Sequence, residues 1–317
     1  MSSPSVNSGT ARTTTASGRL PEARHLPYVG RFAPSPTGPL HLGSLTTAVA
    51  SYLHARQAGG EWLVRIEDID PLREPPDAAT DILKTLDAYG LHWDRDLVYQ
   101  STRIAEYRTT AQALLQRGVA FRCSCSRKDV EESTSGTRRY PGTCRSRAAH
   151  AGPTSIRVLV EPGILRFRDG LQGPIEANLH DTEGDYVVYR RDDLPAYHLA
   201  VVVDDHWQGV DAIVRGTDLL TTTPVHIHLR GLLGMPEPRY FHLPILTDRR
   251  GVKLSKQTGA VPVGNEYSAT TAVRVLELLG LAVPDDLRGA PGRELWGWAM
   301  RHWRIEELIR RQSIHID

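Results

Sequence analysis

The sequence predicts an α/β fold, in which a parallel sheet carries helices on its faces, with an inserted β-rich module and a short helical C-terminal region. Strand-like apolar runs alternate with helical patterns between residues 28 and 117, and buried strand-like runs resume at residue 196. This alternation is typical of parallel sheets, because a crossover, usually a helix, must connect parallel strands. At 317 residues, the chain is long enough for two or three domains.

The first half of the predicted sheet occupies residues 29–118. A strand-like run at 28–33 (YVGRFA) stops at Pro34, and apolar residues at helical spacing follow over 42–59. The other elements expected in this half are a strand over 61–70 and helices over 77–89 and 104–117.

The pattern of apolar residues changes over residues 119–195, where short apolar stretches alternate with turns rich in Gly, Pro and Asp. This pattern predicts the inserted β-rich module. The second half of the sheet is expected over 196–262, and a helical region over 263–317. The elements expected there are strands over 196–206 (AYHLAVVVDDH), 211–216 and 240–247, and helices over 223–233, 270–281 and 294–312.

Composition indicates a globular protein and excludes few partners. Lys and Arg number 38 against 37 Asp and Glu, and 40% of residues are hydrophobic. No apolar stretch approaches the roughly 20 residues of a membrane span, and no secretory signal is recognisable. We therefore expect a cytoplasmic protein. Residues 1–28, rich in Ser and Thr, are expected to form a disordered tail.

The segment RFAPSPTGPLHLGS (31–44) joins a strand, a Pro/Gly turn and the start of a helix. Helix N-termini attract anions, and Gly38 and Gly43 would let a nucleotide approach the backbone. His41 would then stand beside the phosphates as a hydrogen-bond donor. In isolation, the segment is equally well explained as a Pro-rich turn before a helix.

A second segment, KLSKQ (253–257), follows the strand-like run that ends at residue 247. Lys253 and Lys256 could both place ammonium groups on a triphosphate, although a Lys-rich loop on its own is usually just solvated. Together, HLGS and KLSKQ resemble the HIGH and KMSKS signatures of class I aminoacyl-tRNA synthetases. The departures are Leu254 and Gln257, which stand where the signature has Met and Ser.

RFAPSPTG, RIEDID, AYHLAVVVDDH and VRG narrow the resemblance, over residues 29 to 260, to the glutamyl-tRNA synthetase branch. This resemblance implies a Rossmann-like sheet, ATP with Mg²⁺, catalysis by His41 and Lys256, and formation of glutamyl-adenylate. The implied ATP-binding residues are His41, Gly43, Lys253 and Lys256. The implied glutamate-binding residues are Arg31, Phe32, Ala33, Pro34, Ser35, Glu67, Tyr197 and Arg215.

The chemistry of these residues suits glutamate, whose two carboxylates need guanidinium partners and whose ammonium needs an acid. Each residue also has an ordinary alternative. Glu67 could be a surface acid at a strand end, Arg215 part of a structural salt bridge, and Tyr197 a core aromatic residue.

Cysteine spacing predicts a metal site. The chain has an odd number of cysteines, clustered at Cys123, Cys125 and Cys144, which does not suit a secreted disulfide framework. Zn²⁺ is the metal ion that such a set of thiolate ligands would be expected to bind. The spacing leaves the fourth ligand open among Tyr140, His150, Asp129 and water. The pattern C-x-C…Y-x-x-x-C with YPGTC resembles the short paralogues of glutamyl-tRNA synthetase, the glutamyl-queuosine tRNA(Asp) synthetases, which implies a structural zinc with Tyr140 as fourth ligand.

That resemblance also implies that glutamate is activated without tRNA and passed to the queuosine base in the anticodon of tRNA(Asp). Only residues 258–317 follow KLSKQ, so no anticodon-binding domain is expected. The alternatives are a truncated glutamyl-tRNA synthetase charging a tRNA 3′ end, a non-catalytic glutamate- or adenylate-binding module, and another nucleotidyltransferase with a His-x-Gly turn. A monomer is expected, because no heptad pattern is evident.

Overall fold

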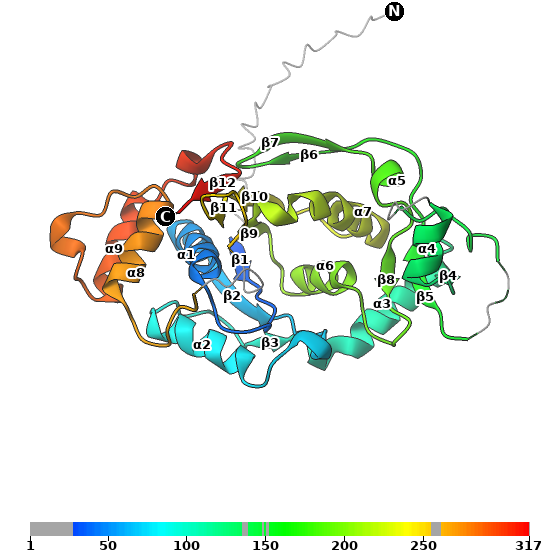
Figure 1. The fold of residues 1–317 in the computed structure, drawn as a ribbon, viewed down its shortest axis with the longest axis horizontal. Helices are drawn as coiled ribbons and strands as arrows, with labels where there is room; N and C mark the ends of the chain where they lie inside the picture. The colour runs from blue at the N-terminus through cyan, green and yellow to red at the C-terminus, as the bar shows by residue number, and fades with distance from the viewer. Residues whose placement is uncertain (1–27, 135–138, 148, 150–151, 255–260, 317) are drawn as a thin grey trace, which may run out of the picture.

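The structure, a computed structural model, describes residues 28–134, 139–147, 149, 152–254 and 261–316. The molecule is elongated, with a parallel sheet near its middle (Figure 1). Two groups of strands meet where β1 lies beside β9, since the Asp211 N–H donates to the Val29 carbonyl at 3.1 Å. The predicted parallel sheet is confirmed. Its strands are β1 (Val29–Phe32), β2 (Glu61–Ile66), β3 (Val98–Tyr99), β9 (Ala212–Gly216) and β10 (Arg239–Leu243).

Helices cover the first half of the sheet as predicted. The first one begins behind a capping box, in which His41 and Ser44 each accept a hydrogen bond from the other's backbone N–H. Its buried face packs between the sheet and the C-terminal helices, in a core that also includes Tyr28, the last residue of the predicted tail. The helices of this core are α1 (Leu42–Gln57), α2 (Ala78–Ala88), α8 (Ala269–Leu278) and α9 (Gly292–His302), whereas α3 (Ile104–Gln116) packs in a second core against strands of the inserted module.

The strand predicted over 196–206 is wrong, because this segment forms the helix α6 (Tyr197–Trp207). Every residue from Leu199 to Asp205 is buried there. A run that is buried on all sides carries no periodicity, so sequence alone does not separate a buried strand from a buried helix. The neighbouring helix α7 (Thr223–Leu233) is confirmed at the predicted residues, and the two helices share a second core with α3.

The inserted module contains a three-stranded antiparallel sheet at the end of the molecule opposite α8 and α9 (Figure 1). The β-rich prediction is therefore confirmed for part of the segment. The hairpin of β6 (Leu165–Asp169) and β7 (Gly173–Ala177) instead extends the central sheet, where β6 runs parallel to β10. The other elements of the module are β4 (Ala120–Cys123), α4 (Arg127–Ser133), β5 (Ser155–Val158), α5 (Leu179–Thr182) and β8 (Val187–Tyr189).

The C-terminal region is not helical throughout. After α9 the chain forms a short 3-10 helix at Ile305–Leu308 and then β12 (Ser313–His315), which pairs in parallel with β11 (Ile245–Thr247). The helix predicted over 294–312 is wrong beyond His302. Trp303, Ile305 and Leu308 are all buried, whereas one continuous helix would turn residues 303 and 305 about 200° apart. Among the described residues, no helix is long and apolar enough to cross a membrane.

Candidate active site and metal site

A cavity of about 470 Å³ opens beyond the end of β1, at the start of α1. Its volume lies within the range of roughly 300–1,000 Å³ that is usual for small-molecule and cofactor sites. One wall comes from the strand–turn–helix segment and the opposite wall from the chain around Gly216 and Lys253. Of the residues expected at the site, those lining this cavity are Phe32, Pro34, Ser35, His41, Gly43 and Lys253.

His41 is held in one orientation by its own helix. Its Nδ1 accepts the Ser44 backbone N–H at 3.2 Å, while Ser44 Oγ accepts the His41 N–H at 2.8 Å. Because Nδ1 is an acceptor, the neutral ring carries its hydrogen on Nε2. An added Cβ at Gly43 would lie only 3.2 Å from this ring, so a larger residue would press on the imidazole.

Lys253 forms an ion pair with Asp218, a residue that was not predicted at the site. Its Nζ lies 2.6 Å from Oδ2 of Asp218, and both residues line the large cavity. The sequence signal for Asp218 was its position three residues after Arg215 in VRGTD. Lys256 and Gln257 lie outside the described residues.

A second cavity of about 100 Å³ adjoins the first, because Ser35 and Thr37 line both. Glu67 and Tyr197, both expected to bind glutamate, line this smaller cavity, together with Arg190. The arrangement therefore places a small polar site next to a larger one that is the size of a nucleotide pocket.

Arg31 and Glu67 are fixed by a buried ionic network from α6 and β2. Asp205 lies 3.2 Å from Arg31 Nε and 2.9 Å from Arg65 Nη1, and Arg65 Nη2 lies 3.2 Å from Glu67 Oε1. Burial, which the charges of Arg65 and Arg31 only partly offset, raises the pKa of Glu67. Sequence reasoning missed Asp205 as a site residue, although its signal was an Asp-Asp pair inside an apolar run.

Arg215 is buried among neutral partners. Its N–H groups donate to the His242 ring at 3.1 Å, the Thr223 hydroxyl at 2.7 Å and the Leu219 carbonyl at 3.2 Å, and Nη1 lies 3.3 Å from His226 Nδ1. Within the described part of the chain, no carboxylate forms an ion pair with it. Burying a guanidinium without an acid is costly, so this arrangement suits a ligand that brings its own carboxylate.

Tyr197 connects Arg215 with the smaller cavity. Its ring packs against the ring of His226, with centroids 5.6 Å apart, and His226 in turn contacts Arg215. Burial raises the pKa of Tyr197 to about 12, so its hydroxyl is neutral and available as a hydrogen-bond donor. Arg31, Ala33 and Arg215 do not line either cavity, and Arg31 and Arg215 are buried in the protein.

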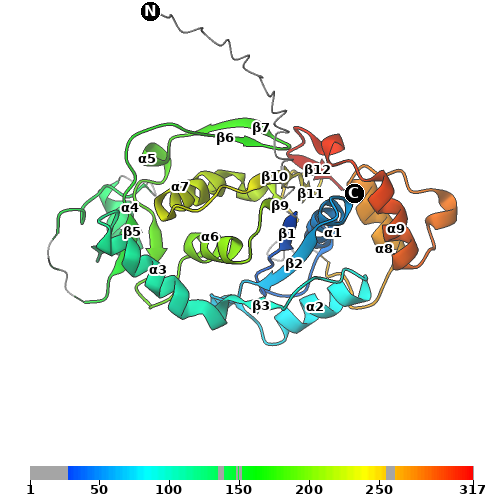
Figure 2. The ribbon, with the colours of Figure 1, turned by 180° about the vertical axis from the view of Figure 1, so that it is seen from behind.

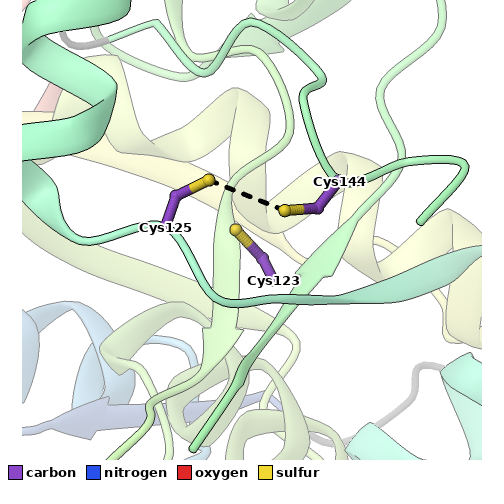
Figure 3. Close-up of side chains that lie close together, drawn as sticks. All are labelled: Cys123, Cys125 and Cys144. Carbon is purple, nitrogen blue, oxygen red and sulfur yellow. Dashed lines mark hydrogen bonds between the residues drawn. The ribbon is translucent and has the colours of Figure 1, made fainter. Parts of the chain in front are cut away.

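The three cysteines converge at the far end of the molecule. The thiols of Cys123, Cys125 and Cys144 point toward one another (Figure 3), and their sulfur atoms all lie within 4.8 Å of each other. The Tyr140 hydroxyl joins them, at 3.4 Å from Cys123 Sγ and 3.9 Å from Cys125 Sγ. Asp129 instead caps α4, where it accepts the Ser126 N–H at 2.7 Å. His150 lies outside the described residues.

These distances fit a tetrahedral metal ion. Ligands about 2.3 Å from zinc at the corners of a tetrahedron lie roughly 3.8 Å apart, and the Cys125 and Cys144 sulfur atoms are 3.6 Å apart. Burial and the neighbouring thiols raise the pKa of Tyr140, although its oxygen accepts the Cys144 backbone N–H at 2.8 Å, which lowers it in part. The phenolate form would therefore depend on the charge of a bound metal ion. The cluster can therefore hold a metal ion.

Comparison with known proteins agrees with this geometry. The family model of the catalytic domain of class I tRNA synthetases (E and Q) matches residues 28–286. The glutamyl-Q tRNA(Asp) synthetase of Dechloromonas aromatica is 47% identical over 91% of this chain and 98% of its own length. That of Methylococcus capsulatus is 48% identical over 92% of this chain and 96% of its own.

A solved structure shows the same fold. The glutamate-tRNA synthetase from Elizabethkingia anophelis superimposes with a TM-score of 0.77 at 23% identity, covering 92% of this chain and 68% of that one. The chain belongs to the class I tRNA synthetases of the E and Q type, within the group of the glutamyl-Q tRNA(Asp) synthetases.

Proposed function

We propose that this chain activates L-glutamate with ATP, without needing tRNA, and transfers the glutamyl group from the adenylate to the queuosine base in the anticodon of tRNA(Asp), with AMP as the leaving group. In the first step an oxygen of the glutamate α-carboxylate attacks the α-phosphorus of ATP. The new P–O bond forms as the bond to pyrophosphate breaks, which gives glutamyl-adenylate. ATP would occupy the larger cavity with Mg²⁺, which offsets the phosphate charge, and the enzyme supplies positioning and electrostatic stabilisation.

The adjoining cavities carry this proposal. Ser35 and Thr37 line both, so an amino acid in the smaller cavity would lie beside a nucleotide in the larger one. The His41 Nε2–H would donate to phosphate oxygens, and Lys253 and Lys256 would neutralise phosphate charge. Glu67 would pair with the glutamate ammonium, while Arg215 and Arg31 would attract its carboxylates.

Glutamate-dependent exchange of labelled pyrophosphate into ATP tests the first step. We expect exchange with glutamate and ATP alone. Glutamine should give none, because its side chain lacks the charge that the pocket pairs, and aspartate should give much less, because its side-chain carboxylate is one methylene group shorter. Absence of exchange both with and without tRNA would refute activation and leave only a binding module.

The acceptor is inferred from the relatives that are named glutamyl-Q tRNA(Asp) synthetases. An anticodon base lies in a single-stranded loop, the type of RNA element whose bases proteins can splay out, enclose and read. Labelled glutamate should be offered with queuosine-containing tRNA(Asp), unmodified tRNA(Asp) and tRNA(Glu). We expect label only on the first. Equal labelling of both forms of tRNA(Asp), or charging of tRNA(Glu) at its 3′ end, would contradict this acceptor.

We infer that the cysteine cluster holds one structural Zn²⁺, with Tyr140 as fourth ligand. Cys123→Ser should lose most of its zinc. Tyr140→Phe should bind zinc at least roughly 10-fold more weakly, because even outer-shell partners of metal sites contribute that much. Metal content by mass spectrometry and competition with a chromophoric chelator measure both effects.

Tyr189→Phe is the matched control, because this buried tyrosine lies in the same module but donates to the Asp193 carbonyl. It should bind zinc as the unmodified protein does. If Tyr140→Phe also binds zinc with unchanged affinity, water or another group is the fourth ligand.

We further propose that the protein acts as a monomer in the cytoplasm. Light scattering tests the oligomeric state, and cell fractionation tests the location.

A further inference from the structure

We propose that Asp169 and His242 act as a positioning pair that holds the Arg215 guanidinium in the orientation needed to bind a substrate carboxylate. The proposal rests on the function proposed above for Arg215. His242 contacts Arg215 at 3.1 Å and Asp169 contacts His242 at 2.6 Å, so the pair would act on the guanidinium; like Arg215, neither residue lines either cavity. The pair would therefore influence the affinity for glutamate indirectly, by setting the orientation of Arg215.

Asp169 sets the tautomer of His242. Its Oδ2 lies 2.6 Å from His242 Nδ1, and its Oδ1 accepts the backbone N–H groups of Leu171 at 2.9 Å and Gln172 at 2.8 Å. Despite its burial, the hydrogen bonds from His242 and these N–H groups lower the pKa of Asp169. An ionised carboxylate can only accept, so His242 must carry its hydrogen on Nδ1.

The tautomer then decides what His242 offers to Arg215. With the hydrogen on Nδ1, Nε2 is an acceptor, and it faces Arg215 Nε at 3.1 Å. The Thr223 hydroxyl contacts both side chains. It lies 3.0 Å from His242 Nε2 and accepts a hydrogen bond from Arg215 Nη2 at 2.7 Å. A hydrogen on Nε2 would instead point at a guanidinium N–H, which is also a donor.

The remaining contacts of the guanidinium leave room for a ligand. Four of its five N–H groups are taken up by His242, Thr223, the Leu219 carbonyl and His226. This leaves one Nη1 hydrogen without an acceptor in the part of the chain that the structure describes. Because these four partners are neutral, the positive charge stays available for a carboxylate.

The β6–β7 hairpin places Asp169 beside His242. It leaves the inserted module and runs along the top of the molecule to the central sheet (Figure 2), where Asp169 is in register with Tyr240 of β10. The Gly170 N–H donates to the Tyr240 carbonyl at 2.8 Å, and an added Cβ at Gly170 would lie 2.4 Å from the Phe241 ring. Only glycine permits this close approach, which brings a carboxylate from the hairpin to His242.

The Asp169→Asn variant tests the pair with little change in shape. The amide can keep its oxygen toward the Leu171 and Gln172 N–H groups, but its NH₂ group then faces His242 Nδ1. The ring must move its hydrogen to Nε2, where it opposes Arg215. We expect the KM for glutamate in pyrophosphate exchange to rise roughly 10- to 100-fold, as when a buried hydrogen bond is lost, with the KM for ATP within about 2-fold of the original.

Two comparisons separate positioning from general damage. Asp211→Asn removes a carboxylate that pairs with the exposed Arg239 just before β9, and it should leave the KM for glutamate unchanged. In a double-mutant cycle, Asp169→Asn should add little to His242→Phe, because Asp169 acts through the imidazole. Multiplying effects in the double variant would contradict the proposed pair.

Nitrogen-15 NMR of the histidine rings reads the tautomer without reference to activity, with His242 assigned by its loss in His242→Phe. We expect the Nδ1–H form in the unmodified protein and the Nε2–H form in Asp169→Asn. The Nε2–H form in the unmodified protein, or an unchanged KM for glutamate in a folded Asp169→Asn variant, would overturn the proposal. If the unmodified protein showed no glutamate-dependent exchange, the proposed function would fail instead, while the tautomer would still report on the pair.

Discussion

Replacing Arg215 with methionine is expected to lower kcat/KM for glutamate by on the order of 1,000-fold, because a buried group that pairs with a substrate charge contributes roughly 4 kcal/mol to binding. The KM for ATP should stay near its original value, since the role proposed for Arg215 concerns the glutamate carboxylates alone. Pyrophosphate exchange at varied glutamate and ATP concentrations measures both quantities.

Stability should respond much less than activity in this variant. In the ligand-free protein, Arg215 is a buried charge without an acidic partner among the described residues. Its removal relieves the cost of burying the charge and forfeits hydrogen bonds to His242 and Thr223, so we expect the free energy of unfolding to change by no more than about 2 kcal/mol. Arg166→Met is the matched control, because Arg166 is exposed and pairs with Glu176 on the surface. A large loss of stability in Arg215→Met, with glutamate binding retained, would make Arg215 a structural residue.

Replacing Asp205 with asparagine is expected to destabilise the protein by about 3–5 kcal/mol, the usual cost of removing one partner from a buried ion pair. Asp205 is 1% exposed and lies 3.9 Å or less from Arg31, Arg65 and Arg230. Without its charge, these guanidinium groups lose a shared buried partner. Denaturant unfolding measures the loss. Asp285→Asn is the control, because the Asp285 side chain is fully exposed, and it should leave the free energy of unfolding unchanged.

The same residue gives a defined pH dependence. Burial alone would raise the pKa of Asp205, but Arg31, Arg65 and Arg230 lower it from 3.8 to about 2. Because the folded pKa is the lower one, this contribution is fully present above about pH 4 and is lost as pH falls toward 2. It amounts to about 2 kcal/mol, and the Asn variant should lack this component of acid sensitivity. A variant that remains as stable as the unmodified protein at pH 7 would contradict the role given to this network.

Much of the site was predictable from local sequence because local chemistry fixes it. The strand–turn–helix segment positions His41 through its own capping box with Ser44, only three residues away. Cys123, Cys125, Tyr140 and Cys144 lie within a short stretch of chain, and the structure brings all four together. Residue type and spacing are sufficient signals in such cases, since few contacts from distant segments are needed.

Other parts of the site depend on contacts between segments far apart in the chain. Asp205 meets Arg31 across 174 positions of sequence, and Asp169 meets His242 across 73. No local pattern states which distant residue such an acid will contact. The helix α6 was mistaken for a strand for a related reason, because packing on all its sides removes the alternation of polar and apolar residues from which secondary structure is predicted.

The sequence by itself determined the class of the sheet, the capped start of α1 and the cysteine cluster, because the patterns that mark them lie within short stretches of chain. The residue types proposed for the glutamate pocket came from a resemblance to a known family. The tertiary structure decided which charges are neutralised. It pairs Arg31 and Arg65 with Asp205 but leaves Arg215 among neutral side chains. The energy of a buried charge depends on the groups that the whole fold places within a few ångströms of it, and the order of residues along the chain does not state that.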